Sequence, residues 1–153
     1  PDDAIVAAAL ADHGHRHLTS KRTGFLPVHV LRADGAWRWN AATNTLEQTA
    51  EEDVRKVSTA YQFEYVEKAP VTIVFVADQE RAKNARPTGV YVDAGTMGQS
   101  CYLAAAALGL AGCVRASFDH EELRKAMKLG EKLEPIVLFT CGRPADLSKG
   151  KDA

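Results

Sequence analysis

The sequence predicts a single α+β domain, in which helices cover a small mixed sheet around a long buried central helix. Two apolar runs rich in β-branched residues, 71–77 and 135–141, have the character of strands that are buried on both faces. Between them, residues 90–110 are rich in Ala and Gly and predict the main helix. A chain of 153 residues can bury a core of its own, so we treat residues 1–153 as one domain.

The elements before the first buried strand are predicted to be short. Residues 2–11 begin with two acidic residues and continue with apolar ones, which predicts a short helix. Residues 26–31 and 36–39 flank the Asp-Gly pair at 34–35, a turn signal that is typical of a β-hairpin. Residues 45–47 can add a third short strand.

Two further helical segments are expected beside the first buried strand. Residues 51–61 have an acidic first turn and apolar residues at helical spacing, which favours a helix. Residues 79–86 form a short charged helix or loop, which Pro87 is expected to stop.

The central helix carries a stripe of small residues at three-to-four spacing, namely Gly98, Cys101, Ala105, Gly109 and Gly112. Such a stripe lets another backbone approach closely, which indicates tight packing. Gly109 or Gly112 is the expected terminator of the helix.

The segment after the central helix contains a complete helix-start signal. Residues 113–117 predict a short extended piece. Asp119 as N-cap and Glu122 three residues later form a capping box, with apolar residues on either side as a hydrophobic staple. The helix is expected to run to Leu129, with the following glycine as its cap. Residues 145–153 are polar and predict a tail that is frayed or ordered by a partner.

Composition excludes several classes of function. The chain has 19 basic and 20 acidic residues and a net charge of −1, so it lacks the basic excess of a nucleic-acid binder. Residues 94–114 carry no charge and are long enough to span a membrane, but few of them are strongly apolar. We therefore expect a helix buried in a core, and no membrane partner.

The three cysteines, Cys101, Cys113 and Cys141, form no CxxC pair, and each lies in an apolar run. Free buried thiols are therefore expected, which favours a reducing, cytoplasmic compartment. The chain begins at Pro1 without Met, as a processed or truncated start would.

Residue chemistry alone leaves the site open. The histidines of residues 13–17 alternate, but no acidic or Cys ligand is near in sequence, so a solvated loop is favoured over a metal site. Residues 19–24 combine hydroxyls, cations and a glycine; they can bind a phosphate or form a plain basic loop. Neither a catalytic triad nor a dinucleotide-binding glycine motif occurs.

Three stretches together resemble the nitroreductase family of flavoproteins, especially the dehydrogenase branch that includes thiazoline and oxazoline oxidases. They are residues 35–40 with Leu46, residues 68–71 with Asp78, and residues 93–110 followed by 115–118 and 142–144. The last is similar to the family's core helix, flavin-side strand and final strand. The resemblance covers roughly residues 26–144.

The resemblance implies a nitroreductase-like fold and a homodimer that binds two FMN molecules at the subunit interface. It also implies ping-pong hydride transfer from NAD(P)H through FMN to a small organic acceptor, with the chemistry carried by the flavin and not by a catalytic side chain. The cofactor-binding residues that it implies fall in three groups. Lys21 and Arg22 would hold the phosphate or ribityl chain, and Thr23 and Gly24 would lie near the ring. Arg115, Ala116 and Ser117 would line the ring edge, and Lys149 would be a C-terminal phosphate cation.

The sequence departs from the family pattern in places. The family's N-terminal arginine-serine-arginine motif has no counterpart before Asp2, and Gly24 and Leu26 stand where an asparagine and a glutamine are usual. Ala116 stands where the family often has glycine. These departures motivate an alternative, a flavin-poor homodimer of the same fold that acts as a binding or scaffold protein.

Overall fold

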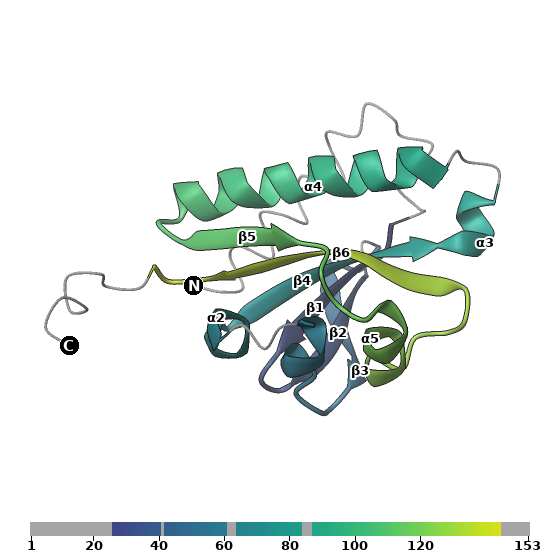
Figure 1. Ribbon diagram of the computed structural model, residues 1–153, viewed down its shortest axis with the longest axis horizontal. Coiled ribbons are helices and arrows are strands. Elements are labelled where there is room, and N and C mark those ends of the chain that lie inside the picture. Colours follow the sequence, from purple (N-terminus) through teal and green to yellow (C-terminus); the bar gives the residue numbers. More distant parts are fainter. Residues whose placement is uncertain (1–25, 41, 61–63, 84–86, 145–153) are drawn as a thin grey trace, which may run out of the picture.

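The computed structural model describes residues 26–40, 42–60, 64–83 and 87–144. Its described strands form one six-stranded sheet in the order β3-β2-β1-β4-β6-β5, and every neighbouring pair is antiparallel (Figure 1). The strands are β1 (Val28–Arg32), β2 (Gly35–Asn40), β3 (Thr45–Ala50), β4 (Val71–Asp78), β5 (Ala111–Arg115) and β6 (Leu133–Gly142). The helices are η2 (Arg55–Ser58), α2 (Glu64–Lys68), α3 (Gln79–Ala82), α4 (Pro87–Ala107) and α5 (His120–Ala126).

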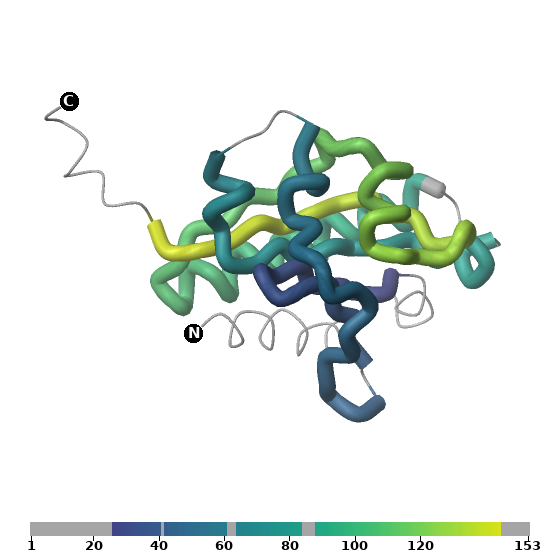
Figure 2. The backbone as a smooth tube through the Cα atoms, turned by 90° about the horizontal axis from the view of Figure 1, so that it is seen from below, coloured from purple at the N-terminus to yellow at the C-terminus, as the bar shows by residue number. Residues whose placement is uncertain are grey.

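The sheet lies between two layers of helices. The long helix α4 covers one face and contacts β5 and β6, whereas α5 contacts β6 from the other face, where α2 and η2 also lie (Figure 1). In Figure 2 the long strand β6 runs through the middle of the molecule, and β4 pairs with it along most of its length. The predicted α+β fold class is therefore confirmed, although the sheet is antiparallel where a mixed one was expected. The long helix is buried only on the side that faces the sheet, and not all round as predicted.

The two central strands contribute to a core on each face. Side chains alternate across a strand, so Ile73 and Phe75 pack toward α4, whereas Val74 and Val76 pack toward α5. All four are almost fully buried. The prediction that residues 71–77 and 135–141 are buried strands is confirmed.

Two local signals in the sequence are also confirmed. The hairpin turns at Ala33 and Asp34, and Gly35 follows as the first residue of β2. Gly35 has a φ of +128°, and an added Cβ would lie 2.1 Å from the carbonyl oxygen of Ala50, so that only glycine fits there. At the start of α5, the carboxylate of Asp119 accepts a hydrogen bond of 2.8 Å from the backbone N–H of Glu122. The helix ends at Ala126 and not at Leu129, since the chain turns into the left-handed region at Lys128.

Other local predictions were wrong. Over the described residues 51–60, the helix expected for 51–61 is reduced to the single turn η2. The Asp53 carboxylate accepts a hydrogen bond of 3.1 Å from the backbone N–H of Arg55, a local bond that competes with helical hydrogen bonding. Pro87 begins α4 instead of stopping the segment before it, since proline suits the first helical position. Of the two expected terminators of the central helix, by contrast, Gly109 is confirmed, since it follows the end of α4 with a φ of +68°, whereas Gly112 lies in β5.

The helix expected over residues 2–11, the histidines of 13–17 and the tail over 145–153 lie outside the described residues. None of the described helices has the combination of length and apolarity that crossing a membrane requires.

The small-residue stripe of α4 faces the sheet of its own chain. Ala94, Gly98, Cys101 and Ala105 are buried, and a Cβ added to Gly98 would lie 2.8 Å from Val114 Cγ2. The opposite side of the helix is open, and a Cβ added to Gly95 would meet nothing within 4 Å. The stripe therefore sets how closely α4 approaches β5.

We expect Gly98→Ala to lower the free energy of unfolding by about 1 kcal/mol and Gly95→Ala to raise it by roughly 0.5–1 kcal/mol. Both changes gain helix propensity, but only the first pushes a methyl group against Val114. Urea unfolding of the two variants measures the difference. Equal stabilities would show that α4 does not rest on β5 through Gly98.

Candidate functional site

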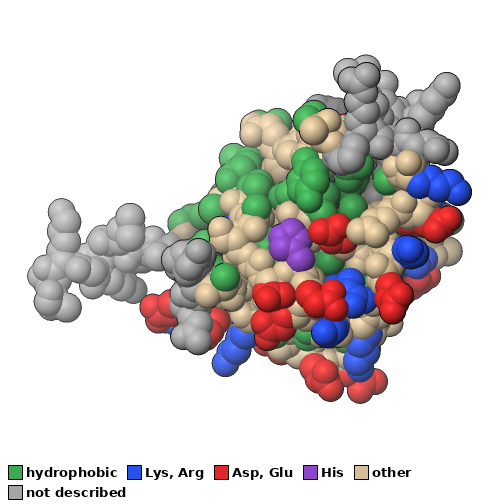
Figure 3. Space-filling model, turned by 45° about the vertical axis from the view of Figure 1, so that its right-hand side comes forward, with side chains coloured by type: hydrophobic (Ala, Val, Ile, Leu, Met, Phe, Trp, Pro, Cys, Tyr) green, Lys and Arg blue, Asp and Glu red, His purple; other side chains and the backbone are tan. Residues whose placement is uncertain are grey.

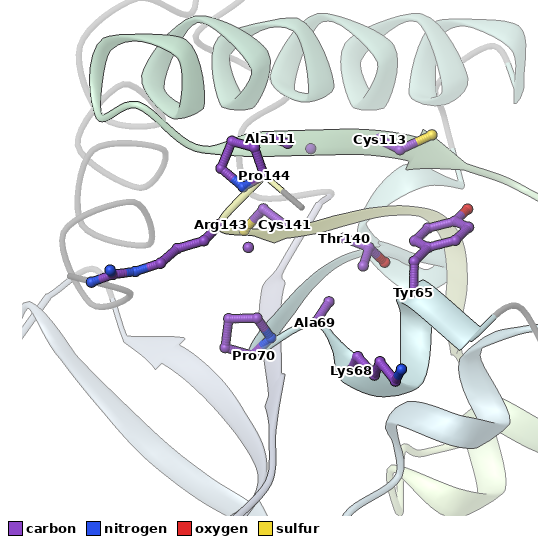
Figure 4. A pocket seen from close by; sticks show the side chains of 12 residues that line it. Tyr65, Lys68, Ala69, Pro70, Ala111, Cys113, Thr140, Cys141, Arg143 and Pro144 are labelled. Carbon is purple, nitrogen blue, oxygen red and sulfur yellow. The ribbon is translucent and has the colours of Figure 1, made fainter. Parts of the chain in front are cut away.

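A pocket of about 600 Å³ opens between the end of β6, the start of β5 and the segment that leads from α2 into β4 (Figure 4). Its volume falls in the range of small-molecule sites. Its lining comes from three separate parts of the chain, namely Tyr65, Lys68, Ala69, Pro70, Ala111, Gly112, Cys113, Thr140, Cys141, Gly142, Arg143 and Pro144.

Much of the pocket wall consists of small or rigid residues. Pro70, Ala111, Gly112 and Gly142 contribute no long side chain. A Cβ on Gly142 would lie 2.8 Å from Pro70 Cδ, so a side chain at this position would press the end of β6 against the segment before β4. A flat ligand can therefore approach the backbone of the wall closely.

The pocket has cations on its wall. Lys68 is exposed and pairs with Glu64 of the same helix, while Arg143 is exposed and extends from the other end of the pocket (Figure 4). Tyr65, Cys113 and Thr140 lie near one another at the end of the pocket opposite Arg143 (Figure 4). Partial burial, followed by the nearby Cys113, raises the pKa of Tyr65, so its hydroxyl is a hydrogen-bond donor at neutral pH.

Arg115, two residues after Cys113 on β5, has only 7% of its surface exposed. Its Nη1 donates a hydrogen bond of 2.6 Å to the carbonyl oxygen of Ser58. Its Nε and Nη2 donate to Thr140 Oγ1 at 3.0 and 2.7 Å, and Nη2 also donates to Ser58 Oγ at 3.2 Å. Each of these acceptors is a neutral oxygen.

The hydroxyl of Thr140 has a defined role in this network. Since Thr140 Oγ1 accepts twice from Arg115, its own proton is left to donate to Thr72 Oγ1, which lies 3.0 Å away. Through these bonds Arg115 joins η2, β6 and β4. Thr140 also lines the pocket, so the guanidinium stands directly behind part of the pocket wall.

The structure places some of the predicted cofactor-binding residues and leaves others undescribed. Arg115 is turned inward, whereas Ala116 and Ser117 are exposed directly after β5. The Ser117 carbonyl accepts a hydrogen bond of 3.3 Å from the backbone N–H of Ala60. Lys21, Arg22, Thr23, Gly24 and Lys149 lie outside the described residues.

Cys113 is exposed, because it lies on β5, the edge strand of the sheet. The expectation of three buried thiols is therefore wrong at this residue. On that edge the Val114 N–H donates a hydrogen bond of 2.8 Å to Tyr102 Oη of α4.

Tyr65 and Thr140 belong to no local sequence motif, and Lys68 was noted only as the first residue of the stretch 68–71. These residues meet because α2 leads directly into β4, which pairs with β6. The Gly142-Arg143-Pro144 run was noted as part of the resemblance, but its place beside the pocket follows from the pairing of β5 with β6. In the described part of the chain, no group of three His, Cys, Asp or Glu side chains is arranged to hold a metal ion.

Comparison with known proteins gives one family and many structural relatives. The family model described as "Nitroreductase family" matches residues 6–143. None of the curated proteins matches the sequence.

Several solved structures share the fold. One from Ralstonia eutropha JMP134, described as a nitroreductase, is 26% identical with a TM-score of 0.77, over 93% of this chain and 73% of that chain. A nitroreductase family protein from Clostridium novyi NT is 19% identical with a TM-score of 0.69, over 97% of this chain and 76% of that one. The Escherichia coli microcin synthetase complex McbBCD is 20% identical with a TM-score of 0.69, over 79% of this chain and 52% of that one.

Proposed function

This chain belongs to the nitroreductase family, and from that premise we propose that it is an FMN-dependent oxidoreductase that passes hydride from NAD(P)H to a small organic acceptor. The observation that carries the proposal is the pocket of about 600 Å³ with a flat wall and cations on its lining. FMN combines a flat ring with an anionic phosphate, and this pocket offers both kinds of surface.

The donor set of the pocket fits this cofactor. The wall at Ala111 and Gly112 has no bulky side chain, so a flat ring can lie against it. Lys68 and Arg143 are cations that suit a phosphate. We also expect the Ala116 N–H to point to the open edge of the sheet, because alternate residues of an antiparallel strand share one side and Val114 donates outward.

We assign the following roles. Arg143, with Lys21, Arg22 and Lys149 from outside the described residues, would hold the phosphate and ribityl chain. Ala116 and Ser117 would line the ring edge, while Thr23 and Gly24 would lie near the ring. When bound, FMN supplies the hydride chemistry, and the chain binds it, orients it and sets its electrostatic environment.

Within the family, we propose the thiazoline and oxazoline dehydrogenase branch. The support is the segment of residues 35–40, which carries that part of the resemblance and forms strand β2 of the hairpin. The likeness to the McbBCD complex agrees with this at the level of the fold.

We further propose that the protein is a homodimer joined through the outer face of α4. Figure 3 shows apolar side chains gathered on the side of the molecule where α4 lies, with charged side chains gathered below. The exposed apolar residues include Tyr91, Val92, Leu103 and Leu108 of α4 and the residue after it. An apolar face of this kind is typical of a surface that a partner covers.

FMN binding tests the main proposal. We expect the full-length protein to bind added FMN with a stoichiometry near one per chain, measured by quenching of flavin fluorescence. Cys113→Trp should weaken binding at least about tenfold by filling the pocket, because this side chain is exposed on the pocket wall. Glu131→Trp, on an exposed turn after α5, is the matched control and should bind as the parent does. A folded protein that takes up no FMN would overturn the proposal and favour the flavin-poor scaffold.

The dimer has its own test. Leu103→Glu places a charge on the exposed face of α4, at a side chain that is 61% exposed, so it should leave the chain folded. We expect light scattering at micromolar concentration to give a dimer for the parent and a monomer for this variant. Ala33→Glu, in the exposed turn between β1 and β2, should remain a dimer. A dimeric Leu103→Glu variant would place the interface elsewhere.

A further inference from the structure

Within the described part of the chain, no opposite charge lies beside the buried guanidinium of Arg115. Its four hydrogen bonds go to Ser58 and Thr140, whose acceptors are a carbonyl and two hydroxyl oxygens. Among the described residues, no Asp or Glu makes an ion pair with it, although ion pairs occur elsewhere in the same part of the chain. Buried charges are usually paired, because a lone charge loses the solvation that water gave it.

The charge of Arg115 reaches the pocket. Burial lowers the pKa of Arg115, and the groups that counter this effect are Tyr65 and Cys113, both on the pocket wall. The interaction is mutual, since Arg115 also opposes the rise in the pKa of Tyr65 that burial causes. Negative charge placed in this pocket is therefore favoured by Arg115, because its Nη2 lies 2.7 Å from Thr140 Oγ1 on the pocket wall and the dielectric around a buried group is low.

We infer that Arg115 is a positioning residue that makes the pocket bind reduced FMN more tightly than oxidised FMN. The inference rests on the proposed function and deepens it, because it assigns to one residue the electrostatic tuning of that site. Hydride transfer breaks the C4–H bond of a reduced nicotinamide, forms an N–H bond at flavin N5 and delivers two electrons with one proton. The nicotinamide leaves as its cation and the flavin gains one negative charge, which is the charge that Arg115 stabilises.

The experiment measures the affinity of the protein for FMN in both redox states. Oxidised FMN is titrated in air, and photoreduced FMN is titrated without oxygen. For Arg115→Gln, which removes the charge but keeps a hydrogen-bond donor, we expect the preference for the reduced form to fall about tenfold. A tenfold fall in the ratio of reduced to oxidised affinity corresponds to a fall of about 30 mV in the two-electron midpoint potential of the bound flavin. Arg115→Lys keeps the charge and should retain most of the preference, which a purely structural role would not predict.

The outcomes are distinguishable. If the parent and Arg115→Gln both bind FMN with the same ratio of reduced to oxidised affinity, the inference is wrong and the proposed function stands. If the folded parent binds neither form, both are wrong. If Arg115→Gln does not fold, by circular dichroism, the parent decides: tighter binding of reduced FMN supports the inference, and tighter binding of oxidised FMN overturns it.

Discussion

Gly112→Ala is expected to lower the free energy of unfolding by about 3 kcal/mol, at the upper end of the cost of overpacking a core. A Cβ on Gly112 would lie 2.2 Å from Phe139 Cζ and 2.7 Å from Cε1. The ring cannot move aside easily, because Phe139 is fully buried in β6 and meets the Tyr102 ring edge-on with centroids 5.1 Å apart. The added methyl group must therefore displace β5 itself, which forms one wall of the pocket.

Chemical denaturation of the variant and the parent measures this loss. Gly130→Ala is the matched control, because a Cβ there meets nothing within 4 Å, and it should change stability little. In a second background, Phe139→Leu, the cost of Gly112→Ala should shrink, since the smaller side chain leaves room for the methyl group. Additive losses in the double variant would show that the ring of Phe139 is not what excludes a side chain at residue 112.

Acid is expected to destabilise the protein through His29 by about 3 kcal/mol between pH 6.5 and pH 4. His29 is 1% exposed on β1, and Arg38 lies opposite it on β2. Its Nδ1 has no hydrogen-bond partner among the residues that the structure describes. Burial first, and then the charge of Arg38, lowers the pKa of His29 from 6.5 to about 4. The unfolded chain thus takes up a proton near pH 6.5, whereas the folded chain resists it until pH 4, and stability falls as the pH falls through this range.

The variant His29→Leu isolates this effect from the carboxylates that also titrate in acid. Urea unfolding of parent and variant at pH 7 and at pH 4 gives the pH-dependent loss of each. We expect the loss to be smaller in the variant by about 3 kcal/mol, because leucine has nothing to protonate. Equal losses of unfolding free energy in the two proteins would mean that the folded chain accommodates protonated His29, through a group that accepts a hydrogen bond from it.

The central fold was predictable where local signals and burial agree. The strand over residues 71–77 and the N-cap at Asp119 depend on side chains within a few positions of each other, and both were confirmed. The segment 51–61 failed because apolar spacing favoured a helix while Asp53 and Arg55 bound each other at its start. The spacing of apolar residues does not report whether a nearby side chain competes with the hydrogen bonds of a helix.

The candidate site was less predictable for a different reason. Arg115 was singled out by resemblance, but its hydrogen bonds to Ser58 and Thr140 span 57 and 25 residues of sequence. A short sequence motif cannot predict a contact between residues so far apart in the sequence, because such contacts follow from the order of the strands in the sheet. The same holds for the meeting of Tyr65 with Cys113, which depends on where α2 lies against the sheet.

The hydrogen bond from Val114 to Tyr102 has a consequence for the behaviour of this protein at high concentration. β5 is an outer strand, and outer strands with free amides can recruit a strand from another molecule and start aggregation. Tyr102 Oη already accepts from the outward amide of Val114, and α4, which carries Tyr102, lies beside this edge of the sheet. A strand from another molecule would have to displace Tyr102 before it could hydrogen-bond to β5 at Val114. Growth of intermolecular β-structure past Val114 is therefore obstructed at this edge of the sheet, and the dimer proposed through α4 would leave this obstruction in place.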